Sequence, residues 1–252
     1  MNLRSLTGLL AAIALLACNS TGVGNPAPEE LALALTTDPE PEPGASDPEQ
    51  ELAAGAVQHA VLVFSDLRWL PCEAAEPTAV VPGPLLVDLV TGRVEPPLPD
   101  VPVPEGGFCG LDAPLTPAPS PAALTGRSVF FSGERDDGTL FLLYANMVGT
   151  VRVRARPGVV WDTRTARALL WAFRPRRWLD RSELDAEAST PLIQDRRVIA
   201  IDVDRHPALH EAITDHIGER SSLCADVDGN RRLDDGECED DNWLGQGLAG
   251  LD

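Results

Sequence analysis

Short apolar runs separated by turn residues constrain the fold of this chain more than any other feature of its sequence. Residues 61–64 (VLVF) and 85–90 (LLVDLV) contain the aliphatic and aromatic side chains that favour strands. Within residues 150–156, apolar side chains at 151, 153 and 155 alternate with arginines at 152, 154 and 156, which is typical of a half-buried strand. Further strands of this kind are expected at 128–132, 140–145, 168–173 and 198–203.

About seven short strands with turn signals between them predict a mainly β fold, and we expect an antiparallel β-sandwich with one or two short helices. Residues 133–138 (GERDDG) predict a hairpin turn, and a long proline-rich loop is expected at 95–121. Pro207 and Gly218 bracket the clearest helix, and a shorter helical segment is expected within 175–188. Residues 104–108 (PEGGF), lying between apolar strands, resemble the strand lead-in of small immunoglobulin-like or transthyretin-like sandwiches in secreted bacterial proteins.

The amino terminus has the order of features of a secretory signal. Arg4 precedes an apolar run at 6–16, and Ala17 stands before Cys18. This arrangement resembles the lipobox of bacterial lipoproteins, which implies cleavage after residue 17 and a lipid anchor on Cys18. The apolar run is shorter than the roughly 20 residues that a membrane-spanning helix needs. The alternatives are an ordinary signal peptide with a chance cysteine and an amino-terminal anchor helix.

Composition then divides the rest of the chain. Residues 18–55 are rich in proline and acidic residues, which predicts a disordered linker. Fully stretched, such a linker would reach on the order of 100 Å. Its one apolar patch, 31–35, is expected to form at most a transient helix. The folded β domain is expected at 56–222, and residues 223–252 are expected to form an acidic tail that carries the calcium loop described below.

Four cysteines remain besides Cys18. In an oxidising compartment four cysteines suggest two disulfides, although the sequence alone allows three pairings. We favour Cys72 with Cys109 and Cys224 with Cys238, because each of these pairs is local in the sequence. The alternative is one or more free buried thiols.

Residues 226–237 (DVDGNRRLDDGE) place oxygen donors at alternate positions of a twelve-residue segment. A hard cation such as calcium takes six to eight oxygen ligands, and a wrapping loop of this kind can direct them at one point. The segment resembles the calcium loop of the EF-hand family. The ligands that this resemblance implies are Asp226, Asp228, Asn230, the carbonyl of Arg232, Asp234 and Glu237, with Leu233 turned toward the core.

The loop departs from the family at its sixth position, where Arg231 replaces the expected glycine. A side chain there is expected to cost on the order of 1 kcal/mol of backbone strain. Because Arg231 and Arg232 also place positive charge near the ion, we expect a weak site with a dissociation constant of roughly 0.1–1 mM. No second helix is expected after the loop, which favours a structural site over a sensor. The alternative is an acidic, solvated tail whose spacing is accidental.

Charge excludes some partners and suggests others. The formal net charge of -19 makes nucleic acid an unsuitable partner. Arg152, Arg154 and Arg156 form a candidate patch for an anionic glycan, lipid head groups or an acidic envelope protein. The simpler interpretation, which we favour, is a solvated sheet face.

Together these features predict a lipid-anchored cell-envelope protein with a binding or scaffolding role and a structural calcium site. We expect it at the outer membrane, because Asn19 is not the aspartate that marks inner-membrane retention. No catalytic motif is recognisable, so an enzyme is not expected. The alternative is a calcium-stabilised envelope hydrolase acting on glycan or peptidoglycan, with Asp202, Asp204 and a histidine clustered in one pocket.

Overall fold

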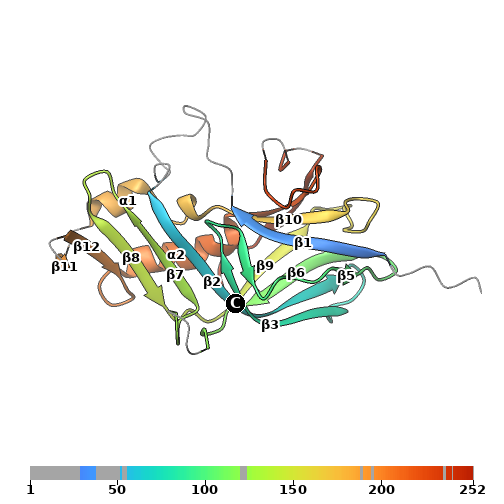
Figure 1. Ribbon diagram of the computed structural model, residues 1–252, viewed down its shortest axis with the longest axis horizontal. Helices are drawn as coiled ribbons and strands as arrows, with labels where there is room; N and C mark the ends of the chain where they lie inside the picture. Colours follow the sequence, from blue (N-terminus) through green and yellow to red (C-terminus); the bar gives the residue numbers. More distant parts are fainter. Residues whose placement is uncertain are drawn as a thin grey trace, which may run out of the picture.

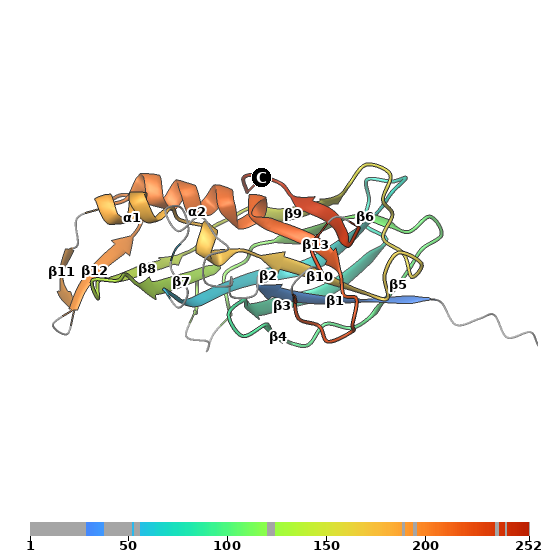
Figure 2. The same ribbon diagram turned by 90° about the horizontal axis from the view of Figure 1, so that it is seen from above.

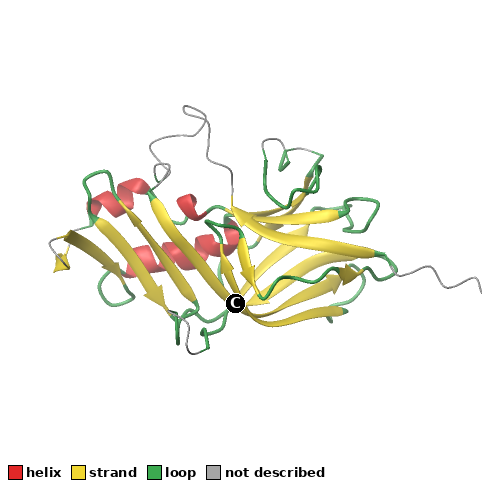
Figure 3. Ribbon diagram, viewed as in Figure 1, coloured by secondary structure: helices red, strands yellow, loops and turns green. Residues whose placement is uncertain are grey.

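In the part of the chain that the structure describes, fourteen β-strands are hydrogen-bonded into one mixed sheet that curls strongly, with two α-helices on part of one face (Figures 1 and 3). The computed structural model describes residues 29–37, 52, 56–119, 124–187, 190–193, 196–234, 237–239 and 241–251. The expected signal peptide at 1–17, Cys18 and most of the expected linker lie outside these residues.

The strands in chain order are β1 Glu30–Thr37, β2 Val57–Pro71, β3 Ala79–Asp88, β4 Arg93–Glu95, β5 Val101–Pro102, β6 Phe108–Pro114, β7 Val129–Glu134, β8 Leu140–Ala145, β9 Thr150–Ala155, β10 Ala168–Phe173, β11 Thr190–Ile193, β12 Arg196–Ile201, β13 Ser221–Ala225 and β14 Trp243–Gly247. The helices are the 3-10 turn η1 Pro175–Arg177, α1 Arg181–Ala186 and α2 Pro207–Glu219.

The predicted antiparallel β-sandwich is wrong, because the strands do not separate into two sheets. The 15-residue strand β2 pairs with β3 along one edge. Along its other edge β2 pairs first with β7, over 57–62, and then with β6, over 68–71. One strand therefore joins what would otherwise be two sheets. The sheet is also mixed, since β1 runs parallel to β10 and β12 runs parallel to β8.

Two arms of the sheet leave β2, one beginning with β7 and the other with β6, and they bury their apolar faces differently. In one arm, α1 and α2 lie along a face of β7 and β8, as Figure 2 shows. Leu209, Ile213 and Ile217 of α2 join the main core there. The other arm curls until β10 faces β2, which stacks the rings of Phe64 and Trp171 with their centroids 6.4 Å apart. The curled sheet thus wraps its own core.

The linker predicted at 18–55 is wrong at residues 30–37, which belong to the sheet. They form β1, which pairs in register with β10 from Ala32–Ala168 to Thr37–Phe173. Leu31, Leu33 and Leu35 are 0, 6 and 1% exposed. The sequence Leu-Ala-Leu-Ala-Leu has the two-residue period of a strand, and burial of its leucines outweighs the acidic, proline-rich context that led us to expect a transient helix at most. The expected linker residues 18–28 and 38–51 lie outside the described residues.

The predicted hairpin and helices are confirmed, whereas the predicted long loop is wrong in part. The hairpin at 133–138 is confirmed, because it joins the antiparallel pair β7 and β8. The helix that begins at Pro207 is confirmed, although it continues to Glu219, and η1 and α1 lie in the expected helical segment at 175–188. The long loop expected at 95–121 is wrong in part, because β5 and β6 lie within it and β6 pairs with both β2 and β9.

Leu35→Ala is expected to lower the free energy of unfolding by about 2–5 kcal/mol, because it leaves a cavity under β1. Glu30→Ala, at an exposed position of the same strand, is the matched control and is expected to change it by less than about 0.5 kcal/mol. Urea denaturation, monitored by circular dichroism, measures the free energy of unfolding of both variants. Equal stability of the two variants would contradict the burial of β1.

Candidate metal centre

The twelve-residue loop at 226–237 connects two neighbouring strands of the sheet. It follows β13 and precedes β14, which pair antiparallel from Ser222–Gln246 to Cys224–Trp243. The segment before the loop is therefore a strand, with α2 ending one element earlier, so the loop closes a β-hairpin and not a helical hand. Residues expected to belong to an acidic tail, 223–225 and 243–247, are strand residues.

Three of the predicted ligands converge at the start and end of this loop. One carboxylate oxygen from each of Asp226, Asp228 and Glu237 lies within 4.8 Å of the others, an arrangement that could hold a metal ion. Asp226 and Glu237 are 6 and 5% exposed, whereas Asp228 is exposed. The residues that the sequence placed at the first, third and twelfth positions are thus brought together.

Main-chain donors hold the two buried carboxylates in place. Asp226 accepts hydrogen bonds from the N–H groups of Gly229 (2.8 Å) and Arg231 (3.1 Å). Glu237 accepts one from Val227 and one from Asp234, each at 2.9 Å. The loop backbone is therefore folded around Asp226 and Glu237 before any cation is considered.

The remaining predicted ligands form a second layer of contacts. The Asn230 side-chain amide donates to Asp228 (2.9 Å) and to Asp234 (2.6 Å). Its carbonyl oxygen accepts the Arg232 N–H at 2.6 Å. Asn230 therefore links two acidic side chains that would otherwise repel each other, while the ligand role predicted for the Arg232 carbonyl stays a prediction.

Arg231 adopts the strained backbone conformation that its position requires. Its φ is +62°, in the left-handed region that favours glycine. Its guanidinium lies 3.9 Å from the Asp100 carboxylate, in the connection between β4 and β5, and both side chains are largely exposed. Because an exposed ion pair contributes little, the turn is kept in spite of Arg231 and not because of it.

Leu233 anchors the loop against the sheet. It is 6% exposed and packs with Leu170 and Ala172 of β10. The expected burial of Leu233 is therefore confirmed, and the cluster that it joins is smaller than the main core and separate from it. The reason is that successive side chains of β10 point to opposite faces of the sheet, and the loop folds over the outer one.

The electrostatics of the loop favour a cation. Burying two carboxylates near a third costs free energy unless positive charge compensates them. Within the described ranges, no arginine forms an ion pair with Asp226, Asp228 or Glu237, and the side chains of Arg231 and Arg232 are exposed. Oxygen donors of this kind match calcium or magnesium better than they match zinc.

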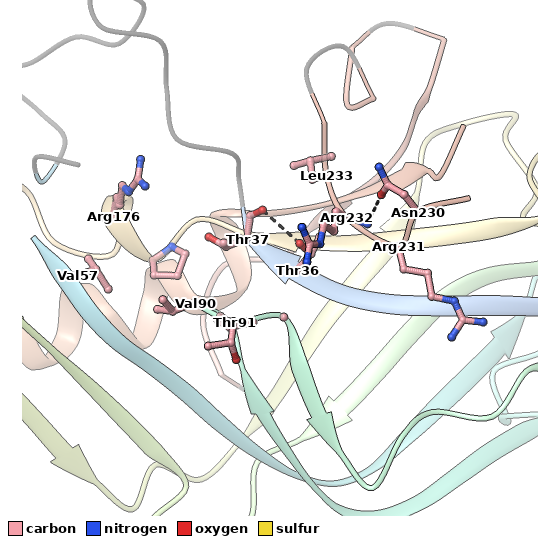
Figure 4. A pocket seen from close by; sticks show the side chains of 13 residues that line it. Thr36, Thr37, Val57, Val90, Thr91, Arg176, Asn230, Arg231, Arg232 and Leu233 are labelled. Carbon is pink, nitrogen blue, oxygen red and sulfur yellow. Dashed lines mark hydrogen bonds between the residues drawn. The ribbon is translucent and has the colours of Figure 1, made fainter. Parts of the chain in front are cut away.

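A cavity of about 670 Å³ beside the loop was not foreseen from the sequence. Figure 4 shows side chains from separate parts of the chain around it. Its lining includes Thr36 and Thr37 of β1, Thr91 of the β3–β4 turn, Arg176 of η1, and Arg232 and Leu233 of the loop. No local sequence signal unites these residues, because the curl of the sheet is what brings them together.

The predicted arginine patch is partly neutralised within the fold. Arg154 donates to the Asp112 carboxylate at 2.6 Å and to the Leu111 carbonyl at 3.2 Å. Arg152 lies 3.9 Å from the same Asp112, and the Arg156 guanidinium lies 5.1 Å from the centre of the Trp243 ring. These contacts favour the interpretation as a solvated sheet face over that of a dedicated anion site.

The residues considered for hydrolysis hold a turn. Asp202 accepts the N–H groups of Asp204 (3.0 Å) and Arg205 (2.7 Å). The His206 ring is 5% exposed, with Nδ1 3.1 Å from the Ala200 carbonyl and Nε2 3.6 Å from Glu187. These contacts shape the entry into α2.

Both predicted disulfides are confirmed, with Cα–Cα distances of 4.7 Å for Cys72–Cys109 and 5.2 Å for Cys224–Cys238. Disulfides form and persist in oxidising compartments, so they indicate a location outside the cytoplasm. Among the helices that the structure describes, none has the length and apolarity needed to traverse a bilayer.

Comparison with known proteins finds no match for this chain. No protein-family model matches its sequence, and neither a curated protein nor a solved structure matches it.

Arg231→Gly is expected to raise the free energy of unfolding by about 0.5–1 kcal/mol, because glycine adopts a φ of +62° without strain. Arg231→Ala removes the same guanidinium but keeps the Cβ atom, so no gain is expected from it. Chemical denaturation in EDTA measures both. A gain of equal size in the two variants would assign the effect to the charge of Arg231 and not to its backbone.

Proposed function

We propose that loop 226–237 is a structural calcium site in an exported, lipid-anchored envelope protein whose role is binding or scaffolding. The observation that carries the metal assignment is the convergence of Asp226, Asp228 and Glu237, two of them buried, on one point. The backbone of Arg231 adds support, because it takes the left-handed turn that this type of loop needs.

Calcium would supply positive charge where the loop concentrates negative charge. Asp226, Asp228 and Glu237 would hold it, and the Asn230 amide links Asp228 of this group to Asp234. The ion would tie the start of the loop to its end, and Leu233 would pass that restraint to β10. The site thereby stabilises the β13–β14 hairpin and is not itself a reaction centre.

Calcium at about 1 mM is expected to stabilise the folded chain by roughly 0.5–1.5 kcal/mol, given a dissociation constant of roughly 0.1–1 mM. Differential scanning calorimetry in calcium and in EDTA measures the shift in melting temperature. Asp228→Asn is expected to abolish the shift, and Glu105→Gln, at an exposed position outside the loop, is expected to keep it. Identical melting curves for the unaltered protein in calcium and EDTA would rule out the site.

Export and lipid anchoring are supported by the signal-like amino terminus and by the two disulfides. Because β1 belongs to the sheet, only residues 19–28 separate Cys18 from the first described residue, Glu29. Such a segment spans at most about 40 Å, well short of the 100 Å expected for the whole linker. The anchor would therefore hold the sheet close to the membrane.

Cys18→Ser is expected to move the protein from the membrane fraction to the soluble fraction, because the acceptor of the lipid is lost. Immunoblotting of fractionated cells measures the distribution, and Ser20→Ala, two residues further on, is the matched control. Retention of the serine variant in membranes would exclude lipid anchoring through this residue.

A binding role is supported better than hydrolysis. Asp202 and His206, which the hydrolase alternative needs in a pocket, are engaged in the turn before α2. The 670 Å³ cavity beside the loop is lined by threonines and arginines together with apolar residues such as Val90 and Leu233, which suits ligand binding. An anionic envelope glycan or protein fits the arginines that line it.

A further inference from the structure

The Cys224–Cys238 disulfide lies immediately outside the proposed metal loop. Cys224 precedes Asp226 by two residues, and Cys238 directly follows Glu237. We propose that this bond sets the metal affinity of the loop, so that the site binds calcium well only while the bond is oxidised. The inference rests on the proposed calcium site and adds a regulator to it.

The hairpin ladder does not hold the far end of the loop. Regular pairing between β13 and β14 reaches Cys224–Trp243, and the next link is the hydrogen bond from the Ala225 N–H to the Asn242 carbonyl, at 2.9 Å. Glu237 and Cys238 lie outside the paired residues of β14, which begins at Trp243. The disulfide therefore adds a covalent restraint to the hydrogen bond from the Val227 N–H, and together they keep Glu237 beside Asp226.

The carboxylates of the loop oppose that restraint when no cation is bound. Asp226, Asp228 and Glu237 repel one another at separations within 4.8 Å, and two of them are buried. Without the disulfide, the loop relieves this repulsion by moving Glu237 outward, and calcium must then reorder it. With the disulfide, the ordering cost is met before the ion arrives, which is preorganisation of the site.

Burial protects the bond that carries this restraint. Cys224 is 0% exposed, and Cys238 packs against the cluster of Leu170, Ala172 and Leu233. The other disulfide contrasts with it, because Cys72 is exposed and the bond lies at the end of β2, on different strands from the loop. The Cys72–Cys109 disulfide is therefore an internal control for the effect of the Cys224–Cys238 disulfide on calcium binding.

The coupling is reciprocal, because a bond that strengthens calcium binding is itself strengthened by calcium. Reduction by a dithiol breaks the sulfur–sulfur bond with two electrons and two protons. It leaves two thiols on the protein and converts the dithiol into its own cyclic disulfide. Calcium is expected to shift this equilibrium toward the protein disulfide by the same factor by which the disulfide raises calcium affinity.

Calorimetric titration of the full chain with calcium chloride tests the proposal. The double variant Cys224→Ala/Cys238→Ala is expected to bind calcium about tenfold more weakly than the unaltered protein. The control variant Cys72→Ala/Cys109→Ala is expected to bind within twofold of it. Equal affinity in all three proteins overturns the proposal, and so does equal weakening in both variants.

A second measurement uses the unaltered protein and does not depend on how either variant folds. The protein is equilibrated with a dithiothreitol redox buffer in calcium or in EDTA, and mass spectrometry of alkylated peptides quantifies each disulfide. Calcium is expected to shift the Cys224–Cys238 equilibrium about tenfold, which corresponds to about 30 mV, and to leave Cys72–Cys109 unchanged. If calcium binds but shifts the redox equilibrium of neither disulfide, this inference alone is overturned. If the oxidised protein does not bind calcium, the proposed site and this inference are both overturned.

Discussion

Hydrogen bonding along both edges of β2 is the constraint on which the rest of the structure depends. The strand pairs with β3 on one side and successively with β7 and β6 on the other, so its two ends direct the sheet into separate arms. One arm needs helices to cover it, and the other curls until Trp171 meets Phe64. Without this shared strand, the two arms would be separate sheets.

The position of loop 226–237 is a product of that curl. β13 and β14 lie in the arm that closes toward β1, which places the outer face of β10 under Leu233 and the β4–β5 connection near Arg231. The loop thus rests on a preformed surface. This support explains how Asp226 and Glu237 lie close together although the next described element after the loop is the strand β14 and not a helix.

What the sequence predicted well is local in the chain. The alternating oxygen donors, the strain at Arg231 and the pairing of Cys224 with Cys238 all depend on residues within fifteen positions of one another. What it predicted badly depends on distant partners. Nothing near residues 30–37 signals that they pair with 168–173. The proline-rich context of 95–121 predicted a loop in place of β6, whose partners are β2 and β9. Burial decided both segments, and burial is a property of the assembled sheet.

The parallel pairing of β1 with β10 also determines how the molecule bears mechanical load. Tension applied through the amino terminus acts along β1, parallel to the direction in which this strand would have to slide past β10. The paired residues from Ala32–Ala168 to Thr37–Phe173 then share the force at the same moment and are not peeled apart in sequence. A pull along β1 would therefore have to break these paired residues together before the strand could leave the sheet.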